Sequence, residues 1–305
     1  MKATSILTSA ALLLTAITSR AALPVEPSTT ITFPLVPGDN YLAPGLVHAW
    51  TDCRTLTAVT PTTLTFSTAS WTAGAFASGY YVELGTAGTG EGCWAEITGN
   101  TATTLSVTTD FTAVAPVGKE FIIRRHVTIG SFLGVTNTAG LLAGSDLSTA
   151  DEVMIHHNMT GTVIACFYDG TGWYDENFNP AADVTIPPDR VLIIRRKAGP
   201  LSPSFAGRVR QNRICIPLHT SWNLVPQPAR PAGAAFGNWT LGTSLLNPAS
   251  QPLVMAMPNY TGIFTAPAFS FSSNPWAGGG TNTTILTAGR VANVFAMPGY
   301  TKWCR

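Results

Sequence analysis

Short runs of β-branched and aromatic residues, separated by turns rich in glycine and asparagine, follow one another along most of this chain. Residues 62–67 alternate polar and apolar side chains, which is the period of a half-buried strand. Two further strand patterns, 80–84 and 93–97, flank the glycine-rich segment 85–92, and a fourth follows at 103–107. This order of strand and turn signals predicts a series of β-hairpins.

Helical periodicity is weak by comparison. The nearest approach to an apolar stripe with a period of 3.6 lies in residues 141–153, where 148–152 could form one helical turn. The sequence therefore predicts an all-β fold, either an antiparallel β-sandwich or two linked sandwich-like β modules after a signal peptide.

The segment 116–125 has an echo at 187–196. Each segment contains a turn, an apolar run and two successive arginines. Such a run predicts a strand buried on both faces, with the arginines emerging at its end. Two interpretations stay open: the arginine pairs line one rim that binds an anionic partner, or each pair ends a core strand and contacts local acids. A weaker likeness between 33–38 and 216–225 suggests that each of these segments opens a β module.

The acidic residues end at Asp189. All sixteen Asp and Glu lie at or before this position, whereas residues 190–305 contain eleven Lys and Arg and no acid. Unlike charges on two parts of a chain attract each other, within one molecule or between molecules. From this distribution of charge we predict an acidic β-rich module at 22–199 and a basic, acid-free β-rich module at 200–305. A signal peptide is predicted at 1–21.

The first residues are typical of a secretory signal. Lys2 supplies a positive charge, residues 6–17 are mostly apolar, and Ser19 and Ala21 are small residues at the −3 and −1 positions of a cleavage site. The apolar stretch is shorter than the ~20 residues that a membrane-spanning helix needs. The protein is predicted to be exported to the cell surface or the extracellular space, with the periplasm as the alternative, and not to span a membrane.

The composition points to the same environment. Only 11% of residues are charged, and Thr, Ser, Ala, Gly, Pro and Asn take their place, as in secreted β-rich fibres, surface-layer proteins and carbohydrate-binding proteins. None of the five cysteines stands in a CxxC motif, so neither a zinc ribbon nor a thioredoxin-type site is indicated. In an oxidising compartment five cysteines allow two disulfides and one odd thiol.

Several motifs together resemble a known family. They are the signal sequence, the segment GNTATTL at 99–105, the hairpin YDGTGWY at 168–174, the IPP motif at 186–188 and the Ile-Ile-Arg-Arg strand ends. The combination is similar to a family of uncharacterised, exported, β-rich proteins of about this length from Verrucomicrobia and their relatives. The family has no assigned activity, so the resemblance implies a fold and export only.

Cations at the two arginine pairs, and in the acid-free stretch after the second pair, could bind an anion or another copy of the chain. The candidate assembly or anion-binding residues are Arg124, Arg125, Arg195, Arg196, Lys197, Arg208, Arg210 and Arg213. Nucleic acid is not expected as a partner, because the charges of the exported chain sum to nearly zero. An acidic protein surface fits better, and the first part of this chain supplies one.

Binding of polysaccharide is the second hypothesis, because sugar rings stack on exposed aromatic side chains. The glycan-binding candidates are Trp173, Trp239 and Trp276, although most tryptophans of globular proteins lie in cores or interfaces.

The segment 169–177 carries oxygen ligands that a calcium ion could use. The candidates are Asp169, Asp175 and Asn177, but the spacing of an EF-hand is absent, and a tight hairpin explains the same residues. Paired carboxylates such as Asp175 and Glu176 also serve as general acid and base in carbohydrate-active enzymes. The chain has no GxSxG, P-loop, HExxH or GxGxxG motif, so we lean towards a protein without enzymatic activity, and no cofactor is predicted apart from this calcium ion.

The sequence therefore favours an exported structural or cell-surface protein. We expect self-association head to tail, acidic region against basic region, or binding to another surface protein. Threonine-rich strands would also suit edge-to-edge pairing. In the competing interpretation the two regions neutralise each other inside one monomer. A secreted carbohydrate-binding module and, after it, a carbohydrate-active enzyme are the alternatives.

Overall fold

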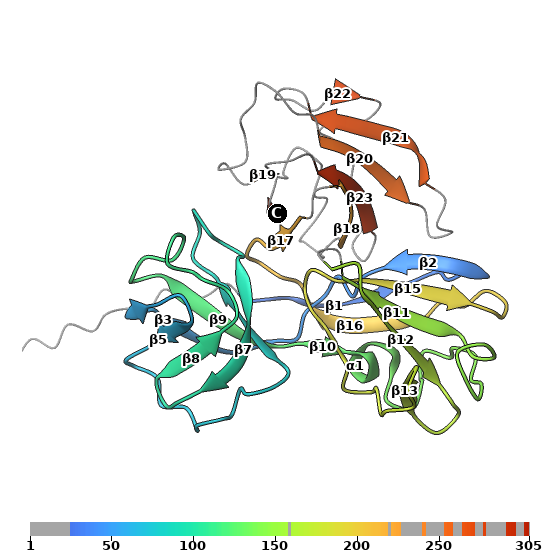
Figure 1. Ribbon diagram of the computed structural model, residues 1–305, viewed down its shortest axis with the longest axis horizontal. Coiled ribbons are helices and arrows are strands. Elements are labelled where there is room, and N and C mark those ends of the chain that lie inside the picture. Colours follow the sequence, from blue (N-terminus) through green and yellow to red (C-terminus); the bar gives the residue numbers. More distant parts are fainter. Residues whose placement is uncertain are drawn as a thin grey trace, which may run out of the picture.

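Antiparallel β-sheets form almost all of the regular structure in a computed structural model of the chain (Figure 1). The structure describes residues 25–157, 160–218, 221–226, 240–241, 253–258, 264–271, 277–278, 291–296 and 302–304. The strands fall into three groups. We call residues 50–125 the first body, residues 28–42 with 127–208 the second body, and the strands within 215–304 the C-terminal sheets.

The first body is one seven-stranded antiparallel sheet. In sheet order its strands are β3 (Trp50–Thr55), β9 (Glu120–Arg125), β6 (Tyr80–Leu84), β7 (Trp94–Asn100), β8 (Thr104–Val107), β5 (Thr63–Thr65) and β4 (Ala58–Val59). One face of β9 carries Phe121 and Ile123 into an apolar cluster with Phe66 and Phe111. The rings of Phe111 and Phe121 meet edge to face, with centroids 5.2 Å apart, a favoured aromatic geometry.

The second body is built around a five-stranded antiparallel sheet. In sheet order its strands are β13 (Trp173–Asp175), β12 (Val163–Tyr168), β11 (Glu152–His156), β15 (Val191–Arg196) and β2 (Gly38–Leu42). Two strand pairs complete it: β1 (Ser28–Thr32) with β16 (Ser204–Arg208), and β10 (Val127–Thr128) with β14 (Thr185–Ile186).

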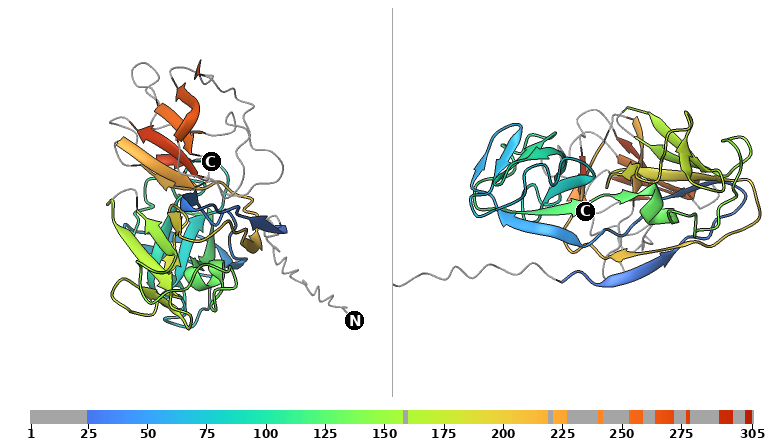
Figure 2. Two further views of the ribbon diagram at one scale, coloured as in Figure 1. Left: turned by 90° about the vertical axis from the view of Figure 1, so that its right-hand side faces the viewer. Right: turned by 90° about the horizontal axis from the view of Figure 1, so that it is seen from below.

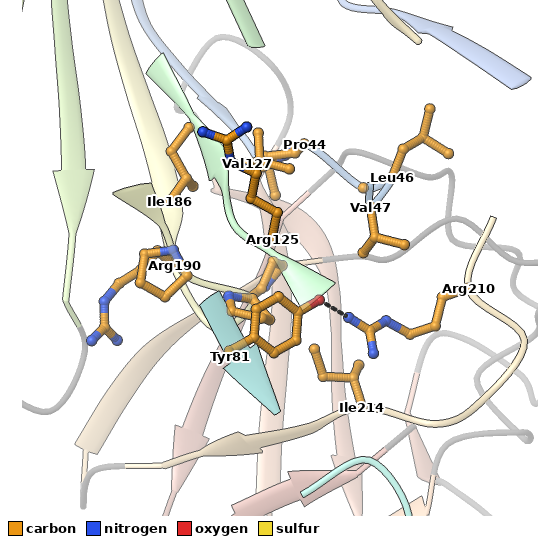
Figure 3. A pocket seen from close by; sticks show the side chains of 15 residues that line it. Pro44, Leu46, Val47, Tyr81, Arg125, Val127, Ile186, Arg190, Arg210 and Ile214 are labelled. Carbon is orange, nitrogen blue, oxygen red and sulfur yellow. Dashed lines mark hydrogen bonds between the residues drawn. The ribbon is translucent and has the colours of Figure 1, made fainter. Parts of the chain in front are cut away.

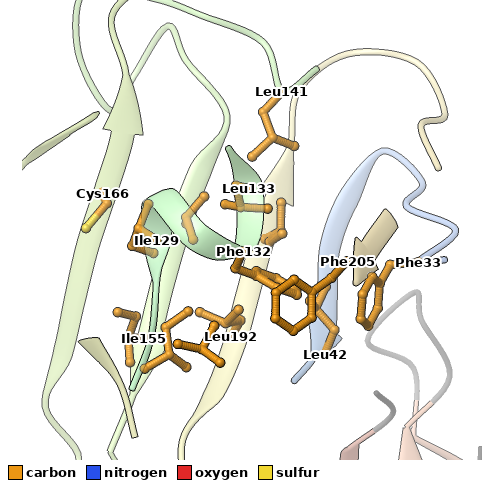
Figure 4. Close-up of a cluster of buried hydrophobic side chains, with 14 of the residues drawn as sticks. Phe33, Leu42, Ile129, Phe132, Leu133, Leu141, Ile155, Cys166, Leu192 and Phe205 are labelled. Carbon is orange, nitrogen blue, oxygen red and sulfur yellow. The ribbon is translucent and has the colours of Figure 1, made fainter. Parts of the chain in front are cut away.

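One short helix, α1 (Ile129–Leu133), packs over the second sheet among the described residues (Figure 4). Thr128 and Ser131 form a capping box: the Thr128 hydroxyl accepts from the Ser131 amide at 3.1 Å, and the Ser131 hydroxyl accepts from the Thr128 amide at 2.8 Å. Phe132 lies between the rings of Phe33 and Phe205, with centroids 5.4 Å and 5.1 Å away. The helix therefore belongs to the core of the second body.

The C-terminal sheets lie beside the two bodies, at the top of Figure 1. A three-stranded sheet has the order β17 (Cys215–Pro217), β24 (Lys302–Cys304), β19 (Thr240–Leu241). A five-stranded sheet has the order β18 (Ser221–Pro226), β23 (Val291–Ala296), β20 (Leu253–Pro258), β21 (Phe264–Phe271), β22 (Ala277–Gly278). All of their strand pairs are antiparallel.

The chain passes between the first two bodies more than once. It leaves the second body after β2, builds the whole first body from β3 to β9, and returns through β10 to complete the second body. After β16 it runs past the first body to β17. Seen from below, the two bodies lie side by side with the connecting segments between them (Figure 2). The junction is therefore formed by segments that are far apart in the sequence.

The prediction of an all-β fold is confirmed, with several antiparallel sheets and one short helix in the described part of the chain. The expected helical turn near 148–152 is a single turn at 146–150, closed by the Ala150 amide and the Asp146 carbonyl at 2.9 Å. No helix in the described part is long and apolar enough to cross a membrane.

The domain boundaries and export stay predictions. Residues 1–21, the predicted signal peptide, lie outside the described residues. Beyond the predicted boundary at 199, β16 pairs along its whole length with β1, so the hydrogen bonding of the second body continues into the acid-free region.

Candidate functional site

The two strands that form the internal echo, β9 and β15, have equivalent orientations. On β9, Phe121 and Ile123 face the core of the first body. On β15, Leu192 and Ile194 face the core of the second body. Because successive side chains of a strand point to opposite faces, the last arginine of each strand, Arg125 or Arg196, continues the core-facing row, and the one before it points to the other face.

Arg124 emerges on the second face of β9 and is completely buried there. Its Nε donates to Glu83 Oε1 on the neighbouring strand β6 at 2.7 Å, and its Nη1 donates to Glu26 Oε2 at 2.8 Å. Nη1 also donates to the His48 carbonyl at 3.1 Å. One guanidinium therefore joins the sheet, the segment before β1 and the segment that leads into β3.

Arg210 reaches the same carboxylate from the segment after β16. Its guanidinium contacts the second oxygen of Glu83 and donates to the Tyr81 hydroxyl at 3.0 Å. Burial alone would raise the pKa of Glu83, but the guanidiniums of Arg210 and Arg124 outweigh it and lower this pKa. Burial raises the pKa of Tyr81 to about 12. We call the group of Glu26, Glu83, Arg124 and Arg210 the buried ion network; it contains two carboxylates and two guanidiniums.

The arginines of β15 are also paired. Arg196 is buried and contacts Asp151 Oδ2, while Asp151 Oδ1 accepts from the Lys197 amide at 2.7 Å. Arg195 is 46% exposed and contacts Asp39 at 2.7 Å and Glu152 at 3.2 Å. Three of the four arginines of the echo therefore contact carboxylates within the molecule, and all of these carboxylates are at least 41 residues away in the sequence.

The remaining candidate cations continue this arrangement. Lys197 contacts Glu152 at 3.1 Å, Arg213 contacts Glu91 at 3.6 Å, and Arg208 donates to a backbone carbonyl at 3.2 Å. Seven of the eight candidate assembly or anion-binding residues therefore have a partner within the molecule. The exception within the described residues is Arg125, which is exposed and has neither an ion pair nor a side-chain hydrogen bond.

A hollow between the two bodies is lined by Arg125, Arg190, Arg210, Tyr81 and apolar residues (Figure 3). In this view the dashed line joins Arg210 to Tyr81, and the head group of Arg125 lies apart from both. The hollow has a volume of about 50 Å³, far less than the roughly 300 Å³ at which pockets for organic ligands begin. It has room for water and not for a sugar.

The structure overturns one of the glycan-binding candidates. Trp173 is only 2% exposed, and its indole Nε1 donates to the Gly134 carbonyl at 2.8 Å. It is a core anchor of the second body, so its ring faces cannot stack on a sugar. Trp239 and Trp276 lie outside the described residues.

The calcium candidates do not converge on one point. Asp169 accepts from the Thr171 and Gly172 amides in the tight hairpin, at 2.6 Å and 2.8 Å. Asp175 lies at the other end of β13, where it accepts from the Asn177 and Asn179 amides, both at 2.8 Å. Each carboxylate closes its own turn, as the hairpin interpretation expects. The described residues contain no group of three or more His, Cys, Asp or Glu that could hold a metal ion.

The cysteines allow fewer disulfides than the sequence suggests. Cys53, Cys93 and Cys166 are not disulfide-bonded, whereas Cys215 is, and the register of β17 and β24 places Cys215 opposite Cys304. Burial raises the pKa of the Cys166 thiol to about 12, so it stays protonated at neutral pH.

Sequence reasoning missed the acids of the network. Glu83 stands in an otherwise apolar strand pattern, and a carboxylate at a buried strand position requires a cation, which was the available signal. Nothing local marks Glu26 or Arg210 as its neighbours. His126 was also missed: it is buried and lies 2.8 Å from Glu96 through Nε2.

Comparisons of the chain with protein-family models, with curated proteins and with solved structures found no match. The resemblance drawn from the sequence motifs stays a prediction, and the functional argument rests on the geometry of this chain.

Proposed function

We propose that the protein is an exported structural protein of the cell surface or the extracellular space, in which the acidic and basic regions pair within one molecule. The observation that carries this proposal is that ion pairs join residues that are far apart in the sequence. Glu83 of the acidic module joins Arg210 of the acid-free module, and within the acidic module Asp151 joins Arg196. A catalytic or docking role would leave such charged side chains accessible. In this protein they are buried and connect different segments of the chain.

The buried ion network explains how such a fold could stay rigid. The segment around Glu26 and the segment around Arg210 both lie against β6 and β9, and the β1–β16 pair continues from them. Pulling either segment away would leave a buried charge without its partner, which typically costs about 3–5 kcal/mol. The two ends of the second body are thereby fastened to the first body.

Self-association through a strand edge is a second candidate, favoured by one observation. β13 covers only the Cys166–Tyr168 half of β12, so residues 163–165 have no strand on that side among the described residues. Val163 and Ile164, at this edge, are 44% and 48% exposed. An uncharged apolar edge of this kind can pair with another strand.

Light scattering after size-exclusion chromatography, at about 20 mM and about 500 mM salt, tests the proposal, because this range changes screening from weak to strong. We expect a monomer at both salt concentrations across a wide range of protein concentration. An oligomer that dissociates in high salt would instead support head-to-tail contact between acidic and basic surfaces. An oligomer that persists in high salt, and that Val163→Lys converts to monomer, would support edge pairing.

Localisation is tested separately. Cell fractionation and protease accessibility on intact cells should find the mature chain outside the cytoplasm. Recovery of the full-length precursor in the cytoplasm would contradict export.

A further inference from the structure

A groove lined by both apolar and polar side chains lies where the chain crosses between the first two bodies. Its volume is about 480 Å³, and its lining includes His48, Thr51, Arg125, Thr128 and Asp183. His48 precedes β3 and Thr51 lies on it, Arg125 ends β9 and Thr128 ends β10, and Asp183 lies in the loop before β14. The groove is thus part of the junction, and its size suits one or two sugar residues.

The internal echo identifies what is unusual about this groove. Arg125 on β9 and Arg196 on β15 occupy equivalent positions, each extending the core-facing row of its strand by two residues. Arg196 contacts the buried carboxylate of Asp151. No described acid contacts Arg125, so at the equivalent position a guanidinium faces the groove without a carboxylate.

The surroundings of Arg125 are polar and partly desolvated. Burial lowers the pKa of His48, and the charge of Arg125 lowers it further, which disfavours the protonated form of this imidazole beside the guanidinium. His126 also lines the groove; it is buried, and its Nδ1 has no hydrogen-bond partner among the residues that the structure describes. A buried polar atom without a partner is rare in proteins and favours a bound polar group nearby.

We propose that this groove binds a carboxylated sugar residue of an acidic polysaccharide. Arg125 binds the carboxylate with its two-pronged guanidinium, the position that Asp151 fills for Arg196. Asp183, which is exposed on the groove wall, accepts hydrogen bonds from sugar hydroxyls, and the hydroxyl of Thr51 supplies a further donor and acceptor. This site does not depend on the structural role proposed above.

The carboxylate of Asp183 also determines which kind of anion the groove favours. A phosphate would bring up to two negative charges close to this carboxylate, which like-charge repulsion disfavours. A uronic acid carries one negative charge and several hydroxyls, so it satisfies both the cation and the acid of the groove. Sulfated sugars share the single charge per group and are separated by the experiment.

Calorimetry with the mature protein and a trimer of galacturonic acid tests the proposal. Dextran serves as the neutral polymer and dextran sulfate as the sulfated one. Arg125→Ala removes the proposed anchor, and Arg195→Ala is the matched control, because Arg195 is an exposed arginine of the equivalent strand that already contacts Asp39 and Glu152. Thermal unfolding of both variants checks that they fold.

We expect the trimer to bind the wild type and Arg195→Ala equally, to bind Arg125→Ala at least about tenfold more weakly, and dextran not to bind. No binding of the trimer at about 5 mM would overturn the proposal, and so would equal weakening by the two variants, which would indicate unspecific attraction. Tighter binding of dextran sulfate that Arg125→Ala abolishes would overturn the carboxylate assignment.

Discussion

The buried ion network makes a quantitative prediction. Arg210→Met removes one of two guanidiniums and leaves Glu26 and Glu83 with Arg124 alone. Glu83 loses the partner of its second oxygen, and the Tyr81 hydroxyl loses its 3.0 Å hydrogen bond. Because the groups are buried, water cannot replace the lost contacts. We expect the free energy of unfolding to fall by about 3–5 kcal/mol at pH 7.

A double variant separates charge balance from simple loss of contacts. Glu83→Gln alone leaves two guanidiniums with one carboxylate and should also be strongly destabilising. Combined with Arg210→Met, it leaves Arg124 with Glu26, a neutral pair joined at 2.8 Å. The double variant should therefore lose less stability than the sum of the single variants, by at least about 2 kcal/mol.

Urea unfolding followed by tryptophan fluorescence measures these free energies. Arg195→Met is the control, because this exposed arginine also contacts two carboxylates, and exposed pairs contribute only about 0–1 kcal/mol. A loss below about 1 kcal/mol for Arg210→Met, or additive losses in the double variant, would refute the reasoning.

The network also predicts an acid dependence. The pKa of Glu83 is lowered in the folded state, so its contribution is present above its ordinary value of 4.5 and is lost as the pH falls through the lower folded value. Between pH 5 and pH 3 the wild type should lose more stability than Glu83→Gln. Parallel pH profiles of the two proteins would contradict this prediction.

Four further substitutions test other parts of the structure. Trp173→Ala should cost about 3–5 kcal/mol in urea unfolding, because the ring fills the core. Burial raises the pKa of Asp189, which favours the fold below pH 3.8 and opposes it as the pH rises through the folded pKa. Asp189→Asn should therefore be more stable relative to the wild type at pH 7 than at pH 4. Arg125→Ala should raise the pKa of His48 in an NMR titration, yet keep it below 6.5 because burial remains. Cys215→Ser should lower stability by about 2–5 kcal/mol in the absence of reductant.

Each of these has an opposing outcome. If Trp173→Ala were as stable as the wild type and bound glycan more weakly, the ring would have to lie on the surface and not in the core. An Asp189→Asn variant whose relative stability is the same at both pH values would show that the carboxyl is not desolvated. An unchanged pKa of His48 in Arg125→Ala would show that the charge of Arg125 does not affect this imidazole. Equal stability of Cys215→Ser and the wild type would mean that the disulfide does not constrain the unfolded chain.

Local patterns in the sequence predicted the strands well, because alternation and turn residues act over a few positions. The strand pattern at 80–84 matches β6, and the apolar run before Arg124 matches β9. The same reasoning missed α1, since five residues are too few for a helical stripe. Its capping box is readable only once Thr128 is known to end a strand.

Partner choice across long sequence separations could not be predicted. Asp189 marks the end of the acids in the sequence, which suggested two regions that attract each other, but the contacts themselves are set by which faces are covered. Glu83 meets Arg210 because the segment after β16 lies over one face of β6. Periodicity specifies that a side chain points to this face, and it contains no information about what covers it.

The two arginine pairs show most clearly that the sequence pattern predicts the orientation of a side chain but not what covers it. The echo correctly implies that Arg124 and Arg195 share one orientation and Arg125 and Arg196 the other, because both strands alternate in the same way. The burial of each arginine nevertheless depends on which segments cover it. Arg124 is covered by the segment of Glu26 and is buried, whereas Arg195 is half exposed. On the core-facing row the outcome is reversed, with Arg196 buried and Arg125 exposed. Equivalent strands have therefore acquired a structural ion pair in one body and, in the other, a cation at a groove that no described acid contacts, and this cation is where a ligand is to be sought.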